Sequence, residues 1–275
     1  MSLGLIAGGG ELPRAVAESA RAAGRPVFVV ALGGMCGGWA EEFPHERISL
    51  GEPGRALKAL AAAGTKDVLL VGKVERPKFS ELKLDAKGVM VLPKVIAAAR
   101  RGDDALLRML VGLFEEAGFR AVSVAEAAPG LVAEPGSLGR ISPDESHRAD
   151  MTQAFAIVRA LGALDVGQAA AVCEGLALAV EAAEGTDAMI ARIGQLRDNL
   201  RGTPEKRRGV LVKALKPTQD AKTDMPVIGV ETVRRAAEVG LAGIAVEAGK
   251  SLIVGKNAVA AEADRLGLFV VGVSP

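Results

Sequence analysis

The stretch that decides the fold reads Leu3-Gly4-Leu5-Ile6-Ala7-Gly8-Gly9-Gly10-Glu11-Leu12-Pro13. Its apolar half, residues 3–7, is typical of a buried strand. The segment 12–23 that follows places Leu12, Val16, Ala20 and Ala23 on one face of a helix. Three consecutive glycines suit a tight turn between the two elements. The stretch therefore predicts a strand, a loop and a helix in direct succession, the first half of a β–α–β unit.

The same alternation continues on the C-terminal side of this unit. Further apolar runs are predicted as strands and further amphipathic runs as helices, and strand–helix–strand order favours a parallel sheet. We therefore expect an N-terminal Rossmann-like domain over residues 1–127 of the 275-residue chain. Its predicted strands are 3–7, 27–32, 67–71 and 120–124, and its predicted helices are 12–23, 55–63 and 103–117.

Residues 128–150 are rich in Pro, Gly and Ser without sustained periodicity, which predicts a linker. Residues 151–275 return to mixed patterns and predict a second, mixed α/β domain. The expected fold class is thus α/β in two domains. Because the candidate ligand groups described below occur on both sides of the linker, the active site is expected between the two domains. The predicted elements of the second domain are a helix at 151–161, a hairpin of 168–173 with 176–182, a helix around Ile190, strands at 209–215, 243–247 and 269–273, helices at 230–239 and 257–266, and a short hairpin at Gly249-Lys250.

Composition excludes several classes of protein. The chain has 34 basic and 33 acidic side chains, and its aromatic residues are 7 Phe, 1 Trp and no Tyr. This balance lacks both the positive charge and the stacking side chains that nucleic-acid binding needs. Cys36 and Cys173 stand alone, without the spacing of a disulfide framework or a zinc site. We therefore expect a cytoplasmic protein that does not bind nucleic acid.

The glycine loop is the first candidate for ligand binding. Backbone N–H groups at Gly9 and Gly10, together with the start of the following helix, suit a phosphate. The loop does not match a dinucleotide fingerprint, because Pro13 stands at the third glycine position and no acidic residue follows strand 27–32. The alternative is a close strand-to-helix turn without a ligand. A second glycine-rich segment, 33–39, carries Trp39, and its role as packing, lid or lipid contact stays open.

The densest polar cluster is the segment 213–226, which contains Pro217 and ends at Pro226. Its three lysines and two aspartates suit a phosphate ester with a divalent cation, because ammonium groups neutralise phosphate oxygens and carboxylates bind Mg²⁺. The alternative is a solvated surface loop. The segment Glu184-Gly185-Thr186-Asp187 begins a predicted helix, and Thr186 suits either a helix cap or an anion site shared with the lysine-rich segment. His45 and His147 are expected to be structural or surface residues.

Several short motifs, in this order, resemble the LpxI-type UDP-2,3-diacylglucosamine diphosphatases of lipid A biosynthesis. The resemblance spans nearly the whole chain, and the most specific part is Glu-Gly-Thr-Asp followed by Lys-Pro-x-Gln-Asp-x-x-x-Asp-x-Pro. Lys222 stands where many members have arginine, which keeps the charge and loses a bidentate contact. The motifs are Leu5 to Pro13, Val71 to Val74 with Arg76-Pro77, Gly102 to Arg108, Ala182 to Ile190, and Lys213 to Gly229.

The resemblance implies a Mg²⁺-dependent hydrolase in the cytoplasm of a Gram-negative bacterium, in peripheral contact with the inner membrane. It implies water attack at the α-phosphorus of UDP-2,3-diacylglucosamine, with lipid X and UMP as products. Asp224 matches the family's essential aspartate and is expected to be either a general base or a metal ligand. The expected substrate-binding residues are Gly9, Gly10, Lys73, Thr186, Asp187, Lys213, Gln219, Asp220 and Lys222.

Two other functions use similar chemistry. A nucleotide-sugar glycosyltransferase also binds a diphosphate, although the chain contains no Asp-x-Asp motif of the kind such enzymes use. A lipid or nucleotide carrier would bind the same ligand without turnover. A homodimer is left open, as are the acyl-chain preference, the number of metal ions and the extent of domain closure.

Overall fold

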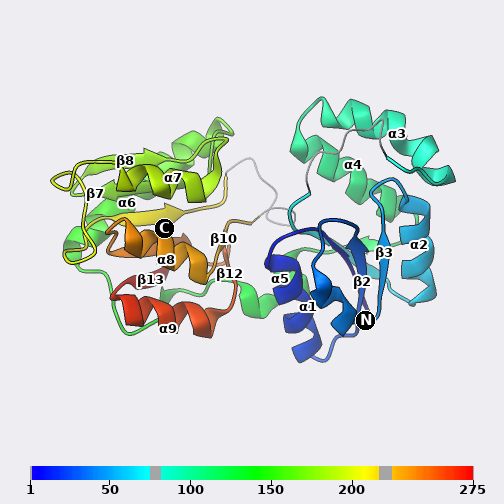
Figure 1. Ribbon diagram of the computed structural model, residues 1–275, viewed down its shortest axis with the longest axis horizontal. Helices are drawn as coiled ribbons and strands as arrows, with labels where there is room; N and C mark the ends of the chain where they lie inside the picture. Colours follow the sequence, from blue (N-terminus) through cyan, green and yellow to red (C-terminus); the bar gives the residue numbers. More distant parts are fainter. Residues whose placement is uncertain (1, 75–81, 217–224, 275) are drawn as a thin grey trace. The chain divides into compact units, whose positions relative to one another are not determined.

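The computed structural model describes residues 2–74, 82–216 and 225–274. The chain forms two compact units, Met1–Gly130 and Leu131–Pro275 (Figure 1). Each unit is an α/β structure with its own sheet, so the expected fold class is confirmed. The two units are described separately below.

Unit 1 is built on a five-stranded sheet in which every pairing is parallel. Strand β1 lies at its centre with all five residues buried, as its continuous apolar sequence predicts. The order β3-β2-β1-β4-β5 means that the chain first runs to one side of β1 and then crosses to the other. The strands are β1 (Leu3–Ala7), β2 (Val27–Leu32), β3 (His45–Ile48), β4 (Asp67–Val71) and β5 (Arg120–Ala121).

Helices cover this sheet on both faces. Leu60 of α2 and Phe114 of α4 pack in one core with Ile6, Val30 and other strand residues. Helix α1 packs on β1 and β2, and α5 lies against α1 and β4. The helical elements are α1 (Leu12–Ala22), η1 (Gly38–Glu42), α2 (Pro53–Ala62), α3 (Ala86–Ala99), α4 (Asp103–Glu116), α5 (Val124–Ala127) and η3 (Pro129–Leu131).

A buried ion pair fixes the amino edge of the same sheet. Asp67, the first residue of β4, has only 2% of its side chain exposed. Arg120 of β5 donates two hydrogen bonds to it, at 2.7 and 2.9 Å, and Arg25 donates another. The Arg120 hydrogen bonds hold the pKa of Asp67 below its usual value. The cluster therefore joins three chain segments where the strands begin.

Unit 2 contains a six-stranded mixed sheet of order β6-β13-β11-β9-β7-β8. Strands β9, β11 and β13 are parallel, whereas β6, on the outer side of β13, and β7, next to β9, are antiparallel to their neighbours. The strands are β6 (Gly136–Ser137), β7 (Ala169–Cys173), β8 (Leu176–Val180), β9 (Val210–Lys213), β11 (Gly243–Glu247) and β13 (Phe269–Val273), with a separate parallel pair β10 (Val227–Ile228) and β12 (Leu252–Ile253).

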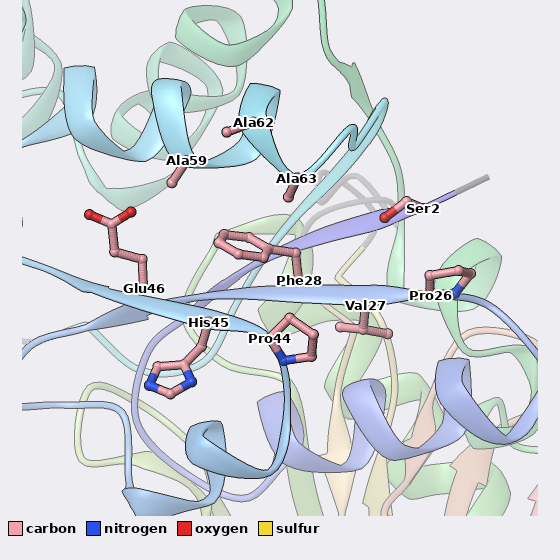
Figure 2. Close-up of a pocket in the computed structure, with 10 residues that line it drawn as sticks. All are labelled: Ser2, Pro26, Val27, Phe28, Pro44, His45, Glu46, Ala59, Ala62 and Ala63. Atoms are coloured by element: carbon pink, nitrogen blue, oxygen red, sulfur yellow. The ribbon is translucent and has the colours of Figure 1, made fainter.

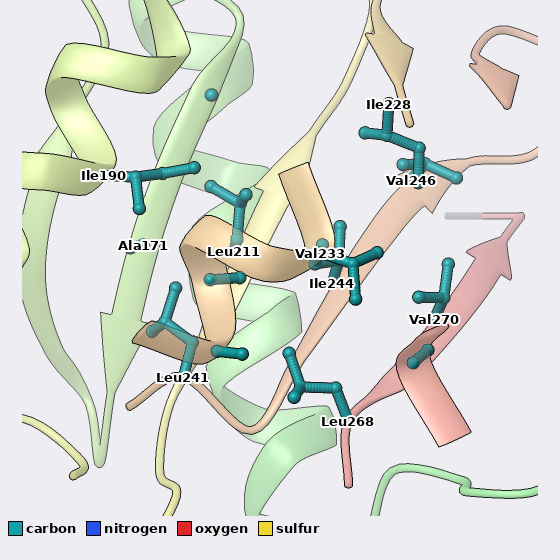
Figure 3. Packing of buried hydrophobic residues seen from close by; sticks show 14 of the residues in the cluster. Ala171, Ile190, Leu211, Ile228, Val233, Leu241, Ile244, Val246, Leu268 and Val270 are labelled. Atoms are coloured by element: carbon teal, nitrogen blue, oxygen red, sulfur yellow. The ribbon is translucent and has the colours of Figure 1, made fainter. Parts of the chain in front are cut away.

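One face of this sheet packs against three helices and the other against one. Ile190 of α7 and Val233 of α8 meet Leu211, Ile244 and other strand residues in the larger core (Figure 3). The opposite face carries side chains such as Val212 and Ala245 and packs on α6. The helices are α6 (Glu145–Ala163), α7 (Gly185–Gly194), α8 (Val230–Glu238) and α9 (Lys256–Leu266). No helix in the described segments is long and apolar enough to cross a membrane.

The structure differs from the sequence predictions at four places in particular. The segment 128–150 contains β6, which pairs with β13, and its end is the first part of α6. The predicted hairpin at Gly249-Lys250 is wrong, because β9 and β13 occupy both sides of β11 and the following strand β12 pairs with β10 instead. Strand 120–124 stops at Ala121, since Ser123 accepts a hydrogen bond from the Glu126 amide and starts helix α5. Ala23 is exposed, beyond the end of α1.

Candidate functional site

Two loops meet at the carboxyl edge of the unit 1 sheet. One contains Gly8, Gly9 and Gly10 after β1, and the other contains Gly72 and Lys73 after β4. The Gly9 amide donates to the Lys73 carbonyl at 2.8 Å, and the Lys73 amide donates to the Gly9 carbonyl at 2.9 Å. The Gly8 amide donates to Val71 at 2.9 Å. Main-chain hydrogen bonds therefore hold the two loops together.

These bonds change the expectation for the glycine loop. The sequence suggested the amides of Gly9 and Gly10 as phosphate donors, but the Gly9 amide, like that of Gly8, is used within the fold. A Cβ atom at Gly8 would lie 2.5 Å from the Lys73 carbonyl oxygen, which explains the glycine there. Within the described part of the chain, no hydrogen bond accounts for the Gly10 amide. The bonds of Gly8 and Gly9 support the tight-turn interpretation for these two residues. Phosphate binding by the Gly10 amide stays a prediction.

Lys73 occupies the position in this sheet that α/β proteins commonly use for ligands. The strand order changes direction between β1 and β4, and the loops after these strands flank a topological switch point. Lys73 is the second residue after β4 and is exposed. An ammonium group at this place can neutralise an anionic ligand.

The neighbouring glycine-rich segment 33–39 is folded against the unit rather than extended as a lid. Arg47 donates to the carbonyls of Cys36 and Gly37, each at 3.3 Å. Trp39 lies in η1 and contacts Phe43 edge-on, with 6.0 Å between ring centroids. Burial raises the pKa of the Cys36 thiol, and the same holds for Cys173 in unit 2. Packing is therefore the role that the structure supports for this segment.

A second group of polar residues gathers at one edge of the unit 2 sheet. Lys213 is the last residue of β9, and Gln168 immediately precedes the antiparallel β7, whose Ala169 pairs with Lys213. Glu181 follows β8, which runs antiparallel to β7 and so ends at this edge as well. The sheet topology therefore brings together three segments that are distant in sequence.

Lys213 is buried, with 6% of the residue exposed. Its Nζ atom donates to the Val227 carbonyl at 3.0 Å. Val227 begins β10, after the segment that the structure does not describe. Lys213 therefore joins the two ends of the polar segment that the sequence singled out.

Glu181 was missed by the sequence analysis. It is 6% exposed and its carboxylate accepts hydrogen bonds from the Thr186 hydroxyl at 2.6 Å and the Gln168 amide at 3.0 Å. A cavity of about 160 Å³ lies beside it. The cavity is lined by Val166, Gly167, Gln168, Glu181, Ala182 and Lys216. Its position could have identified Glu181 from the sequence, because it is an acidic residue at the end of a predicted strand and three residues before Glu-Gly-Thr-Asp.

The start of α7 differs in detail from the expectation. The helix begins at Gly185 after Glu184, and no side chain caps it. The Thr186 hydroxyl donates to Glu181 instead of capping the helix. Asp187 is exposed and its Oδ1 lies 3.7 Å from Nε of Arg235 on α8. Thr186 bonds to Glu181, and Glu181 lines the cavity that Lys216 also lines, so this turn and the start of the lysine-rich segment lie near one another. A shared anion site stays a prediction.

The remaining predicted residues fall outside the described part of the chain. These are Gln219, Asp220, Lys222 and Asp224, and their roles stay predictions. The placement of the ligand between two domains also stays a prediction. Among the described residues, no group of three or more His, Cys, Asp or Glu side chains is arranged to hold a metal ion.

A larger hollow, of about 540 Å³, lies in unit 1 at the opposite edge of the sheet from the loops of Gly9 and Lys73 (Figure 2). It is lined by residues at the starts of β1, β2 and β3 and the end of α2, at the amino edge of the sheet. Its two titratable side chains are already engaged: His45 Nδ1 is 2.9 Å from the Phe43 carbonyl, and Glu46 pairs with Arg55 at 2.8 Å. Ligands of parallel sheets bind at the carboxyl edge, so we do not assign the site here.

Comparison with known proteins gives two results. Residues 2–131 match the family model described as the LpxI N-terminal domain, and residues 134–271 match the LpxI C-terminal domain. A curated protein of Caulobacter vibrioides, named UDP-2,3-diacylglucosamine pyrophosphatase LpxI, is 49% identical over 273 residues. The match covers 99% of this chain and 98% of that protein.

Proposed function

This chain belongs to the LpxI family, and we propose that it hydrolyses the diphosphate of UDP-2,3-diacylglucosamine in lipid A biosynthesis. The observation that carries the proposal is the high identity to the Caulobacter enzyme over nearly the full length of both proteins. The similarity extends over both domains of the family.

The finer proposal is water attack at the α-phosphorus, with UMP and lipid X as products. Asp224 would act on the attacking water, either directly as general base or through a bound metal ion. Lys213 and Lys222 lie on the segment that carries Asp224, and Lys73 lies at the switch point of unit 1. Their ammonium groups would neutralise charge on the diphosphate oxygens.

The cavity residues of unit 2 supply positioning. Glu181 accepts hydrogen bonds from Thr186 and Gln168, which fixes the start of α7 relative to β7. Lys216 is held by Asp165, with 2.8 Å between Nζ and Oδ1. These contacts hold the base of the segment that carries Asp224, and a site held in one geometry reacts faster than a loose one.

Mg²⁺ is the proposed cofactor, and the described donors fit it in type. The Glu181 carboxylate lines the cavity, and so does Gln168, whose side-chain carbonyl oxygen is buried without a hydrogen-bond partner. Oxygen ligands of this kind suit Mg²⁺, which commonly binds one or two carboxylates together with substrate phosphates. Asp224 is the proposed ligand, and Glu181 and Gln168 are further candidates on the described residues of unit 2. The ion would neutralise the diphosphate and favour attack at phosphorus.

The test is incubation of the purified protein with UDP-2,3-diacylglucosamine in ¹⁸O-labelled water, with Mg²⁺ or with a chelator, followed by mass analysis. Attack at the α-phosphorus places the label in UMP, whereas attack at the other phosphorus places it in lipid X. UMP release without an acceptor sugar separates hydrolysis from glycosyl transfer. Tight binding without products would support a carrier and contradict the proposal.

We further propose that the protein works in the cytoplasm of a Gram-negative bacterium, in peripheral contact with the inner membrane. The reason is chemical: the substrate carries two acyl chains and a nucleotide, so it lies in a lipid surface with its diphosphate in water. Fractionation of cells into cytosol and inner membrane, with and without a high-salt wash, tests this location.

A further inference from the structure

Helices α3 and α4 form a hairpin on unit 1 that is poorly buried. Gly88 is the only buried residue of α3, and in α4 no described side chain before Leu113 is buried. The start of α3 is nevertheless fixed, because the Asp85 carboxylate accepts hydrogen bonds from the amides of Gly88 at 2.7 Å and Arg55 at 2.9 Å. The helix is thus anchored at one end and presents a long outward face.

That outward face is apolar where a water-exposed helix is normally polar. Val89 is 59% exposed and Met90 is 72% exposed. Pro93 and Ala97 are exposed on the same side of the helix, one and two turns further along. Exposed single apolar residues are ordinary, but a contiguous apolar stripe marks an interaction surface.

The charges that accompany this stripe are all positive. Lys94 is exposed on α3, Arg100 is exposed at its C-cap, and Arg101 is exposed just beyond it. Residues 86–102 contain four basic residues and no acidic one, in a chain whose total charge is +1. An apolar face with basic residues at its sides is the pattern of helices that lie in the interface of an anionic bilayer.

Exposed apolar residues in unit 2 have different surroundings. Leu164, at 75% exposed, precedes Asp165, and Leu176, at 47%, closely follows Glu174. Anionic lipid would repel these neighbours. The α3 face is therefore distinguished by its charge as well as its exposure.

We propose that the outward face of α3 docks on an anionic lipid bilayer. Val89 and Met90 enter the boundary between headgroups and acyl chains, while Lys94, Arg100 and Arg101 lie at the lipid phosphates. The biological reason rests on the proposed function, since an enzyme that acts on a diacylated substrate must meet it in a membrane. The helix anchor at Asp85 holds the face in a fixed orientation on unit 1.

The test is co-sedimentation of the full chain with phosphatidylcholine vesicles, with and without phosphatidylglycerol. We expect binding that requires phosphatidylglycerol and weakens as salt rises. Met90→Glu should weaken it about tenfold or more, because it removes apolar burial and adds a repelled charge. Lys94→Gln with Arg100→Gln should weaken it by about fivefold per charge. Leu176→Glu and Arg197→Gln, on the surface of unit 2, are matched controls that should bind like the wild type.

Hydrolysis of substrate in detergent micelles separates this inference from the proposed function. The α3 variants should keep wild-type turnover in micelles and an unchanged melting temperature, because they touch no residue assigned to the site. Vesicle binding that is unchanged in both α3 variants overturns the inference. The inference is also overturned if Met90→Glu leaves vesicle binding unchanged and only converts a dimer into a monomer, because a second copy of the chain would then cover the α3 face. Vesicle binding through α3 without any hydrolysis would instead overturn the proposed function alone.

Discussion

The carboxyl edges of the two sheets are built by different means. In unit 1, main-chain hydrogen bonds between the loops of Gly9 and Lys73 form the edge, and the exposed Lys73 ammonium is its charged group in the described loops. In unit 2, side chains form the edge: a buried lysine, a buried glutamate and a threonine hydroxyl. A backbone-built edge tolerates exchange of exposed side chains, whereas a side-chain-built edge does not. Chemistry that needs ionisable groups in fixed positions is therefore expected in unit 2.

The largest expected effect tests whether unit 2 carries the reaction. Asp224→Ala should lower kcat by at least ~10²-fold, because loss of a general base or metal ligand has this cost. Ligand affinity and melting temperature should stay close to the wild type. Asp198→Ala is a control in the same unit, since Asp198 is a largely exposed partner of Arg201. Turnover within a few-fold of wild type in Asp224→Ala would remove the reason to assign catalysis to this unit.

At the amino edge of the unit 1 sheet, the ion pair of Asp67 is expected to contribute to stability rather than to ligand binding. Asp67→Asn should lower the free energy of unfolding by about 3 kcal/mol at neutral pH, because it removes the charge of a buried carboxylate that pairs with the mostly buried Arg25 and the more exposed Arg120. Urea unfolding of wild type and variant across pH measures this. The exposed Glu46–Arg55 pair is the control, and Glu46→Gln should have a much smaller effect.

The pH dependence follows from the lowered pKa of Asp67. A carboxyl group with a lowered pKa in the folded state stabilises the folded protein fully at pH values above its unfolded-state pKa of about 3.9. This contribution is lost as the pH falls through the lower pKa of the folded state. The difference between wild type and Asp67→Asn should therefore be constant near neutral pH and shrink in acid. A difference that grows as pH falls would mean that the Arg120 contact does not favour the ionised form.

Lysine variants compare the carboxyl edges of the two sheets and the segment that carries Asp224. If the lysine ammonium groups contact the diphosphate, replacing any one of them by Ala should raise the activation free energy by roughly 1.5–3 kcal/mol and slow turnover accordingly. The three variants are Lys73→Ala, Lys213→Ala and Lys222→Ala. Lys213→Ala should also lower the melting temperature, because it removes the bond to Val227, whereas Lys73→Ala should not. Lys213→Met keeps the apolar stem and isolates the effect of the charge. Equal stability losses at Lys73 and Lys213 would contradict the contrast between the edges.

The smallest expected effect concerns the main-chain contact in unit 1. Gly8→Ala should destabilise by about 1–3 kcal/mol, because its Cβ would lie 2.5 Å from the Lys73 carbonyl oxygen and the loops must separate. Gly9→Ala is the matched control, since the nearest atom to its Cβ, the Met35 carbonyl oxygen, is 3.4 Å away. Thermal unfolding of both variants measures the difference. If Gly9→Ala costs as much as Gly8→Ala, close approach of the loops is not what requires glycine.

Several elements could be predicted because their signal is local. Strands β1, β2, β4, β11 and β13 are buried apolar runs with polar or glycine ends, and their predicted bounds agree with the structure. The hairpin of β7 and β8 follows from two apolar runs joined by the Glu174-Gly175 turn. Helix α3 was missed because Gly88 and Pro93 interrupt its pattern, and its partial burial weakens the periodicity. Strand β3 was missed because it is a short edge strand with polar residues.

The sequence by itself determined which residue types are available and in what order: buried strands, the glycine loop, the Glu-Gly-Thr-Asp turn and the lysine-rich segment. Tertiary structure alone decided how they are used. It commits the Gly9 amide to Lys73, buries Glu181 as the acceptor for Thr186, and pairs β12 with β10 rather than β11. Each of these outcomes depends on a partner distant in sequence. A residue's hydrogen-bonding capacity is local, whereas its partner is set by sheet order and packing, which no short stretch of the chain contains.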